Sequence, residues 1–143
     1  MADWDRESFE NAMIADMREH GGAVTSGPLA GHPLLILTTR GAQSGKDRRA
    51  ILTYTRDAGD YVVAGSAGGS PTVPSWVHNL DAQPHVTIEV ANRKSAATAT
   101  IVDAGERDRL WEQHVAALPN FAEYPDKAGR VIPVIRITPS TED

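Results

Sequence analysis

The sequence predicts a mainly β, α+β fold built from antiparallel strands with flanking helices. The patterns along the chain run as a helix, several hairpin-connected strands, a second helix and a last strand. Regular alternation of strands and helices would instead predict a parallel sheet. A length of 143 residues and a hydrophobic content of 41% suit one domain with a single core. We therefore expect residues 1–143 to form one small antiparallel barrel or sheet.

The first part of the chain predicts a helix followed by a buried strand. Apolar residues recur at helical spacing over about residues 5–20, and Gly21 and Gly22 follow where a helix would stop. Residues 34–39 form a short, apolar and partly β-branched run, which is typical of a buried strand. We therefore expect an N-terminal amphipathic helix that leads into the first strand.

Hairpins are expected to connect the next strands. Residues 50–55 and 61–65 have the composition of strands, and Gly59 lies between them in a segment that favours a tight turn. Residues 86–90 alternate apolar and polar side chains, which predicts a strand with one solvent-facing side. We expect residues 96–102 to pair with that strand.

The C-terminal part predicts a helix and a last strand. One helical apolar stripe covers residues 110–118, and residues 131–138 resemble a strand in which Pro133 indicates an edge position or a bulge. Glycine, proline and serine are concentrated in residues 65–75 and 119–129. We expect these two stretches to be loops that carry function.

Composition excludes several classes of protein. The chain has no cysteine, so disulfides, thiolate nucleophiles and iron–sulfur clusters are excluded. A net charge of -5 and an aromatic content of 6% argue against nucleic acid as a partner, and the five histidines show no metal-ligand spacing. The acidic N-terminus has no apolar run long enough for a signal peptide or a membrane span. We expect a cytoplasmic monomer or weak homodimer for which membrane association is not indicated.

A basic turn between two predicted strands is the first candidate binding site. Residues 40–49 contain four cationic side chains and only Asp47 as an acid, in a chain that is acidic overall. Gly41 and Gly45 allow backbone N–H groups to point outward, and the cations provide charge for a phosphate or carboxylate. The spacing is not that of a P-loop. A solvated basic hairpin is the alternative.

Two further segments offer surfaces for a flat ligand. Residues 64–70 are almost all small, so a ring or another backbone could approach the main chain closely. A plain flexible loop is the alternative, and a nucleophile elbow at Ser66 is discounted because its preceding glycine is missing. Residues 74–80 predict a short helix that places Trp76 and Asn79 on one side. Trp76 could equally anchor this turn in the core.

In this order, the segments resemble the deazaflavin (F420)-dependent nitroreductase family, which includes F420H2-dependent quinone and enone reductases. The resemblance covers nearly the whole chain and rests on residues 37–48, 62–69 and 74–80. It implies a split β-barrel of the FMN-binding type, with coenzyme F420 as the cofactor and FMN as a less favoured alternative.

The resemblance also implies a cofactor site. The basic turn would hold the phosphate and oligoglutamate tail of the cofactor, the following strand would lie along the deazaflavin, and the other two segments would complete the wall. The implied cofactor-binding residues are Gln43, Ser44, Gly45, Lys46, Arg48, Ile51, Leu52, Thr53, Ala64, Gly65, Ser66, Ala67, Gly68, Ser75, Trp76 and Asn79. Ser66, Trp76 and Tyr124 are the candidate catalytic or substrate-orienting residues, and no metal is implied.

Departures from the family pattern narrow the expected substrate. Ala42, Gln43 and Ala67 stand where relatives carry basic residues, which would weaken binding of the cofactor tail. In the expected lid, Leu118 and Phe121 replace tyrosines of the nitroimidazole-reducing relative. The more apolar lid predicts a flat, hydrophobic acceptor: an unsaturated lactone, a coumarin or furanocoumarin such as an aflatoxin-type compound, or a quinone.

The expected reaction is hydride transfer from the reduced deazaflavin to the β-carbon of an activated double bond. Ser66 or Tyr124 would stabilise the charge on the carbonyl oxygen, and the proton would come from Tyr124 or from water. Three alternatives remain open: a carrier or sensor that binds the deazaflavin without catalysis, an FMN protein on a related barrel, and a structural interaction module.

Overall fold

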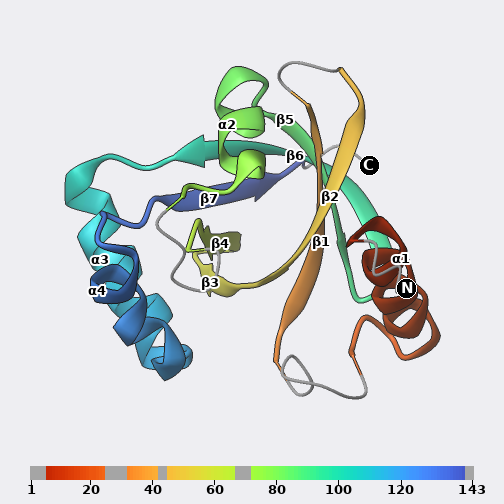
Figure 1. Cartoon of the computed structure of the whole chain (residues 1–143), viewed down its shortest axis with the longest axis horizontal. Helices are drawn as coiled ribbons and strands as arrows, with labels where there is room; N and C mark the ends of the chain where they lie inside the picture. The colour runs from red at the N-terminus through yellow and green to blue at the C-terminus, as the bar shows by residue number, and fades with distance from the viewer. Residues whose placement is uncertain (1–5, 25–31, 42–44, 67–71, 141–143) are drawn as a thin grey trace, which may run out of the picture.

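The computed structural model describes residues 6–24, 32–41, 45–66 and 72–140. The strands are β1 (Leu34–Arg40), β2 (Asp47–Thr53), β3 (Thr55–Asp57), β4 (Asp60–Ala64), β5 (His85–Val90), β6 (Arg93–Ile101) and β7 (Val134–Pro139). The helices are α1 (Arg6–Glu19), α2 (Ser75–Ala82), α3 (Ala104–Ala117), the 3-10 helix η2 (Pro119–Glu123) and α4 (Tyr124–Ala128). One antiparallel, curled sheet has the order β2-β1-β5-β6-β7-β4-β3, with helices on its flanks (Figure 1). The predicted fold class is confirmed.

The sheet curls because one segment of chain supplies both of its edges. β2 and β3 are the edge strands, yet only Tyr54 separates them. β2 pairs with β1, whereas β3 pairs with β4, and the Tyr54 amide donates to the Pro33 carbonyl (3.2 Å). The single strand expected over residues 50–55 is therefore divided, because the chain changes its pairing partner at Tyr54.

The expected hairpins are present. β3 and β4 pair across a turn in which Gly59 has a φ of +91°, a conformation that glycine adopts readily. β5 and β6 pair along their length, from His85 with Thr98 to Val90 with Arg93. These local connections explain why the period-two pattern of the sequence located the strands.

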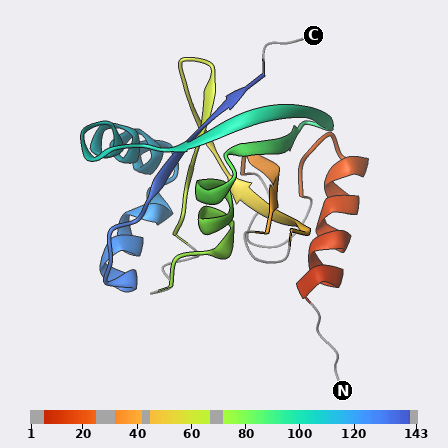
Figure 2. The same cartoon turned by 90° about the horizontal axis from the view of Figure 1, so that it is seen from above.

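The main hydrophobic core lies inside the curl of the sheet. Alternation along β1 directs Leu35 and Leu37 into this core. α2 contributes Trp76, Val77 and Leu80 to the same cluster, and Figure 2 shows this helix within the curl. The short helix is thus held by burial of its apolar side.

α1 covers the outer face of the sheet. Its residues Ile14 and Met17 pack against Leu34 and Ile36 of β1, so the helix expected over residues 5–20 is confirmed with its apolar side toward the sheet. Both views show α1 beside the β1–β2 hairpin (Figures 1 and 2). No helix in the described part of the chain is long and apolar enough to cross a membrane.

Two C-terminal expectations are corrected. β7 begins after Pro133 and pairs with both β4 and β6, so it is a central strand rather than an edge. Pro133 is tolerated because it precedes the strand and uses only its carbonyl, which accepts from the Gly65 amide (2.8 Å). Residues 119–129, expected to be a loop, are largely helical: a proline begins η2, and Gly129 ends α4 at a φ of +67°.

A buried histidine anchors α3. The His114 ring is fully buried, 6.3 Å from the Trp111 ring and 4.6 Å from the Phe121 ring. Its Nδ1 lies 2.9 Å from the Thr55 hydroxyl, and its Nε2 has no hydrogen-bond partner among the described residues. Burial lowers the pKa of His114 from 6.5 to about 4, because the interior disfavours the charged ring. The ring is therefore neutral at pH 7.

Acidification is expected to destabilise the fold through His114. The unfolded chain takes up this proton near pH 6.5, whereas the folded chain resists it until pH about 4. The free energy of unfolding therefore falls as the pH drops through this window, by about 3 kcal/mol in total. Urea unfolding across the window should show a flatter pH dependence for His114→Gln than for the wild type. His85→Gln, at an exposed position, should keep the wild-type slope, and the same slope in His114→Gln would contradict the assignment.

Candidate functional site

The two faces of the β1–β2 hairpin separate its basic side chains. Arg48 pairs with Thr39, and Arg49 pairs with Thr38. Directly paired residues share one face of an antiparallel sheet, so Arg48 lies on the face of α2 and the core, while Arg49 lies on the face of α1. The single cradle expected over residues 40–49 is therefore corrected, because alternation directs its cations to opposite sides.

A tight turn holds the described part of this hairpin. The Gly41 amide donates to the Lys46 carbonyl (2.7 Å), and the Gly45 amide donates to the Gly41 carbonyl (2.9 Å). Gly45 has a φ of +71° with nothing near its missing Cβ, so it is required by conformation rather than by space. Four predicted cofactor contacts lie outside the described residues: Gln43, Ser44, Ala67 and Gly68.

A buried hydrogen bond joins α2 to β1. Asn79 Nδ2 donates to Thr39 Oγ1 over 3.2 Å, and the two residues are only 6% and 2% exposed. One amide N–H of Asn79 is therefore used inside the protein. Trp76 packs in the core beside Leu80, which supports an anchoring function for its ring, whereas Ser75 is exposed.

The strand expected to lie along the cofactor divides its side chains between the two faces. Leu52 packs against the core inside the curl. Ile51 packs against the α1 cluster on the outer face, and Thr53 pairs there with Leu34. Of the three predicted contacts, only Leu52 thus presents its side chain on the side of α2. β2 is also an edge strand, so its outer row of backbone groups has no neighbouring strand within the described part of the chain.

The end of β4 is enclosed by neighbouring side chains. Gly65 and Ser66 are buried, and a Cβ on Gly65 would lie 2.9 Å from both Pro133 and Val77. Contacts below about 3.0 Å between carbon atoms are not tolerated without displacement. At this position the small residue is therefore required by protein neighbours.

Arg130 holds both ends of the small-residue segment. Its Nη2 lies 3.1 Å from the Gly65 carbonyl oxygen, 3.4 Å from that of Ser66 and 3.2 Å from that of Thr72. Sequence reasoning missed this residue because carbonyl acceptors far away in the chain leave no signal in the side-chain pattern. Arg130 is therefore a positioning residue for the wall that Gly65 and Ser66 form.

Tyr124 lies beside the end of β4. Its ring centroid is 5.0 Å from that of Phe121, in a cluster that also contains Ala64 and Leu118. Leu118 and Phe121 are 4% and 7% exposed, so they form a small core rather than the surface of a lid. The expectation of an apolar lid is corrected accordingly. Tyr124 is only half-buried and keeps part of its surface for contacts outside this cluster.

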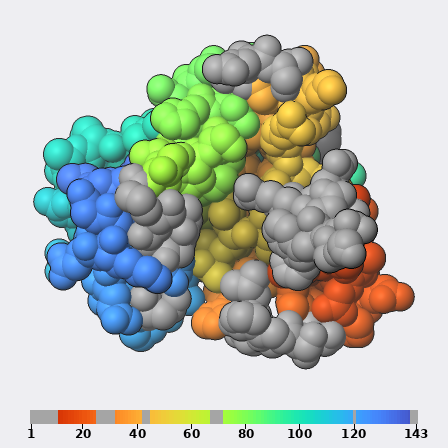
Figure 3. Space-filling view, in the orientation of Figure 1, coloured from red at the N-terminus to blue at the C-terminus, as the bar shows by residue number. Residues whose placement is uncertain are grey.

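The molecular surface is hollowed between α2 and β2. Figure 3 shows this hollow between the green residues of α2 and the gold residues of β2; we call it the α2–β2 groove. The exposed side chain of Arg48 lies on the same face, and no carboxylate in the described ranges forms an ion pair with it. The face of β2 that is turned toward α2 thus carries an apolar residue, Leu52, and an exposed cation, Arg48.

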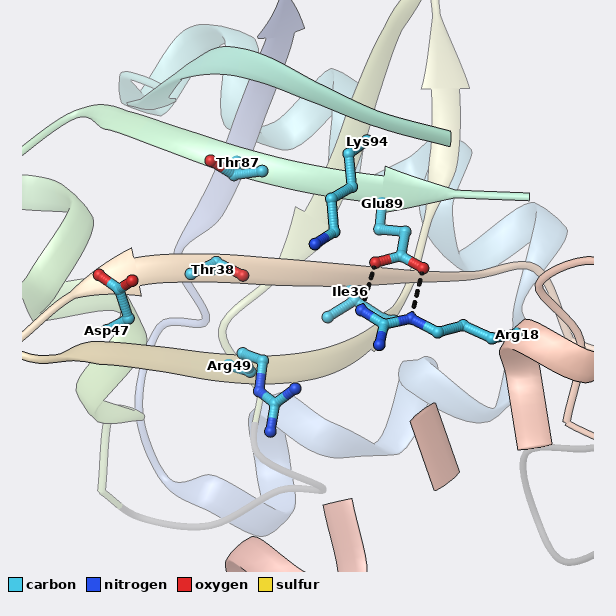
Figure 4. Close-up of a pocket in the computed structure, with 8 residues that line it drawn as sticks. All are labelled: Arg18, Ile36, Thr38, Asp47, Arg49, Thr87, Glu89 and Lys94. Carbon is cyan, nitrogen blue, oxygen red and sulfur yellow. Dashed lines mark hydrogen bonds and ion pairs between the residues drawn. The ribbon is translucent and has the colours of Figure 1, made fainter. Parts of the chain in front are cut away.

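A second concavity lies on the opposite face of the hairpin. It is a pocket of about 300 Å³ on the α1 side of the sheet (Figure 4). Its lining residues are Arg18, Ile36, Thr38, Asp47, Arg49, Thr87, Glu89 and Lys94. None of the predicted cofactor contacts lines this pocket, although Asp47 and Arg49 belong to the basic turn.

The curled antiparallel sheet, with a groove between a short helix and an edge strand, defines a protein of the split β-barrel class. The sequence model of F420H(2)-dependent quinone reductases matches residues 11–139. The chain belongs to this family, and the resemblance found in the sequence is confirmed.

Related proteins agree with this family assignment. An F420H(2)-dependent quinone reductase of Mycobacterium tuberculosis is 38% identical over 109 residues, which are 74% of this chain and 73% of that protein. A solved F420-H2 dependent reductase, FDR-A, superposes with a TM-score of 0.67 at 37% identity, over 73% of this chain and 93% of that one. A solved domain-swapped dimer gives a TM-score of 0.69 at 32% identity, over 93% and 99%. The heme storage protein HutZ of Vibrio cholerae, at 20% identity and a TM-score of 0.56 over 90% and 89%, shares the fold alone.

Replacing Arg130 is expected to release the wall at Gly65 and Ser66. Arg130→Lys keeps the charge but lacks the planar guanidinium group, whose Nη2 lies near all three carbonyls. The free energy of unfolding should fall by about 1–3 kcal/mol, and the amides of Gly65 and Ser66 should exchange faster with deuterium. Arg56→Lys is the control, because Arg56 donates to one carbonyl, that of Gly59 (3.0 Å), which lies outside the Gly65–Ser66 wall. Unchanged exchange at Gly65 and Ser66 in Arg130→Lys would refute the positioning function.

Proposed function

We propose that this protein is an oxidoreductase that uses reduced coenzyme F420 to deliver hydride to a flat, apolar acceptor. The observation that carries the proposal is membership of the F420H(2)-dependent quinone reductase family over residues 11–139. The name of the M. tuberculosis relative specifies a quinone, so a quinone is the first acceptor we assign. Unsaturated lactones, coumarins and aflatoxin-type furanocoumarins have the same flat shape and an electrophilic carbon, and we propose them as further substrates.

The described residues of the α2–β2 groove fit a cofactor with an anionic tail and a flat ring. Arg48 and Lys46 are exposed near one end, while Asp47 lines the pocket on the other face. A phosphate or carboxylate there would therefore meet cations without a carboxylate on the same side. Leu52, which is half-buried on this face, provides apolar surface for a ring system.

The contacts differ in kind along the groove. We assign the tail to the basic turn, the ring to the groove side of β2, and the adjoining wall to the end of β4, which Arg130 fixes in place. Trp76 and Asn79 support α2 from within the protein, so we assign them an indirect effect on the ring. Ile51 and Thr53 are proposed to contact the cofactor through their backbone only. The other proposed cofactor contacts are Gln43, Ser44, Gly45, Lys46, Arg48, Leu52, Ala64, Gly65, Ser66, Ala67, Gly68 and Ser75.

When bound, a reduced deazaflavin supplies a hydride from one ring carbon. The protein's contribution is to hold the acceptor flat at reacting distance and to exclude water. Ser66 or Tyr124 would donate a hydrogen bond to the acceptor's carbonyl oxygen, where negative charge develops as its β-carbon gains the hydride. Tyr124 packs in the same cluster as Ala64, two residues before Ser66, which supports both assignments. Tyr124 or water then supplies the proton that completes the reduction.

Turnover of reduced coenzyme F420 with menadione tests this function, and a panel of coumarins and unsaturated lactones tests the wider substrate class. If the phenol donates the proton, Tyr124→Phe should lower kcat by about 10²-fold with little change in the KM for the cofactor. If water donates it, kcat should stay near the wild-type value. Deazaflavin binding without turnover of any acceptor would indicate a carrier. A yellow purified protein that holds FMN and ignores the deazaflavin would overturn the proposal.

Replacing two adjacent arginines is expected to change the affinity for coenzyme F420 to different extents. Arg48→Ala should weaken binding of coenzyme F420 by about tenfold or more, because a charge-assisted contact on the groove face is lost. Lys46→Ala should act in the same direction. Arg49→Ala removes the same charge from the opposite face and should leave the affinity nearly unchanged. Quenching of cofactor fluorescence measures the Kd, and equal weakening by both arginine variants would mean that only the overall charge of the turn matters.

A further inference from the structure

The pocket on the α1 side of the sheet has a floor of hydroxyl groups. Thr38 of β1 pairs directly with Thr87 of β5 and, on its other side, with Arg49 of β2. Paired residues share a face, so the two threonines and Arg49 form one row across three neighbouring strands. All three line the pocket of about 300 Å³, which places two hydroxyl donors beside a guanidinium.

A second cation completes the pocket from the opposite side. Lys94 is the second residue of β6, and Figure 4 shows its side chain extending over β5 toward β1. No hydrogen bond or ion pair of its ammonium occurs among the described residues. Arg49 donates a hydrogen bond to the side-chain oxygen of Asn11, and the charges of Arg49 and Lys94 both help to lower the pKa of Glu89. Lys94 thus extends toward the threonines from β6, whereas the Arg49 side chain extends from β2 away from β1 (Figure 4) and toward Asn11.

The two carboxylates of the pocket differ in their environment. Glu89 accepts two hydrogen bonds from Arg18, at 3.0 Å from Nε and 2.9 Å from Nη2, and this contact lowers the pKa of Glu89. The pair is mutually neutralised and forms one wall. Asp47 is exposed near the tip of the hairpin and has no ion pair in the part of the chain that the structure describes. Glu89, which pairs directly with Lys94 and attracts both Lys94 and Arg49, opposes their charges together with Asp47. The three cations that line the pocket therefore exceed its two carboxylates by one.

We propose that this pocket is a second binding site, which takes a phosphate or carboxylate group of a small molecule. Lys94, Arg49 and the hydroxyl groups of Thr38 and Thr87 line one pocket, and cations with hydroxyl donors are the groups that bind an oxyanion. The volume lies at the lower end of small-molecule pockets, so the ligand has the size of a short phosphate ester or a dicarboxylate. Asp47 selects against ligands that carry further negative charge toward the hairpin tip.

The site is independent of the proposed cofactor groove. Thr38 and Arg49 lie on the α1 face, whereas Thr39 and Arg48 lie on the α2 face. The proposed function also assigns no ligand contact to Arg49, although this residue belongs to the most basic turn of the sequence. A ligand in this pocket would therefore bind alongside coenzyme F420 and would not compete with it.

Titration of the full chain with inorganic phosphate and, separately, with succinate tests the proposal. Saturable amide shifts in the ¹⁵N–¹H spectrum are expected at Thr38, Thr87 and Lys94, and the two titrations distinguish phosphate from carboxylate recognition. Lys94→Gln, at an exposed position, should weaken binding by about tenfold, and Asp47→Asn should strengthen it. Arg48→Gln is the matched control, because it removes one charge from the other face and should leave the shifts unchanged.

Three results would overturn the second site. They are the absence of saturable shifts with both anions, equal weakening by Lys94→Gln and Arg48→Gln, and unchanged affinity in Asp47→Asn. Urea unfolding of each variant establishes that the fold is intact. Fluorescence quenching by coenzyme F420, measured for the wild type and for Lys94→Gln, separates this site from the groove: equal loss of cofactor and anion affinity in Lys94→Gln would also contradict the proposal, whereas failure of cofactor binding alone would not affect it.

Discussion

The change of pairing partner at Tyr54 is the constraint on which the rest of the structure depends. Because β2 and β3 are consecutive in the chain but lie at opposite edges of the sheet order, the sheet has to curl until its edges meet. The curl encloses the main core and leaves room for α2 at its opening. It also leaves β2 with one row of backbone groups that no strand covers. The groove proposed for the cofactor lies between these two elements.

Strand alternation converts one basic turn into two different surfaces. Arg48 and Arg49 are adjacent in sequence, yet their pairing with Thr39 and Thr38 directs them to opposite faces of a two-stranded hairpin. One face meets α2 and the core, and the other meets α1 and the pocket. Because the hairpin is a single layer of backbone, a charge on one face lies close to the opposite face. A ligand bound on one face can nevertheless contact only the side chains of that face.

Three polar contacts between distant segments hold elements of the fold together. Asn79 binds Thr39 and thereby fixes α2 to β1. Arg130 binds carbonyls at both ends of the small-residue segment, and His114 lies against Thr55 at the point where α3 meets β3. Each contact satisfies polar groups that would otherwise be costly to bury. A wall held in this way can position a flat ligand without first having to become ordered, which lowers the entropic cost of binding.

The sequence by itself determined the fold class, the N-terminal helix, the positions of most strands and hairpin turns, and the family, because periodicity, turn residues and motif order are local properties of the chain. Tertiary structure alone decided which strands pair and what each side chain meets. It divided the strand at Tyr54, made β7 central despite Pro133, directed Ile51 toward α1 and buried Leu118 and Phe121. It also brought Arg130 to carbonyls at Gly65 and Thr72. These outcomes depend on contacts between distant segments, and a main-chain acceptor has the same chemistry whatever residue carries it, so no local pattern could have revealed them.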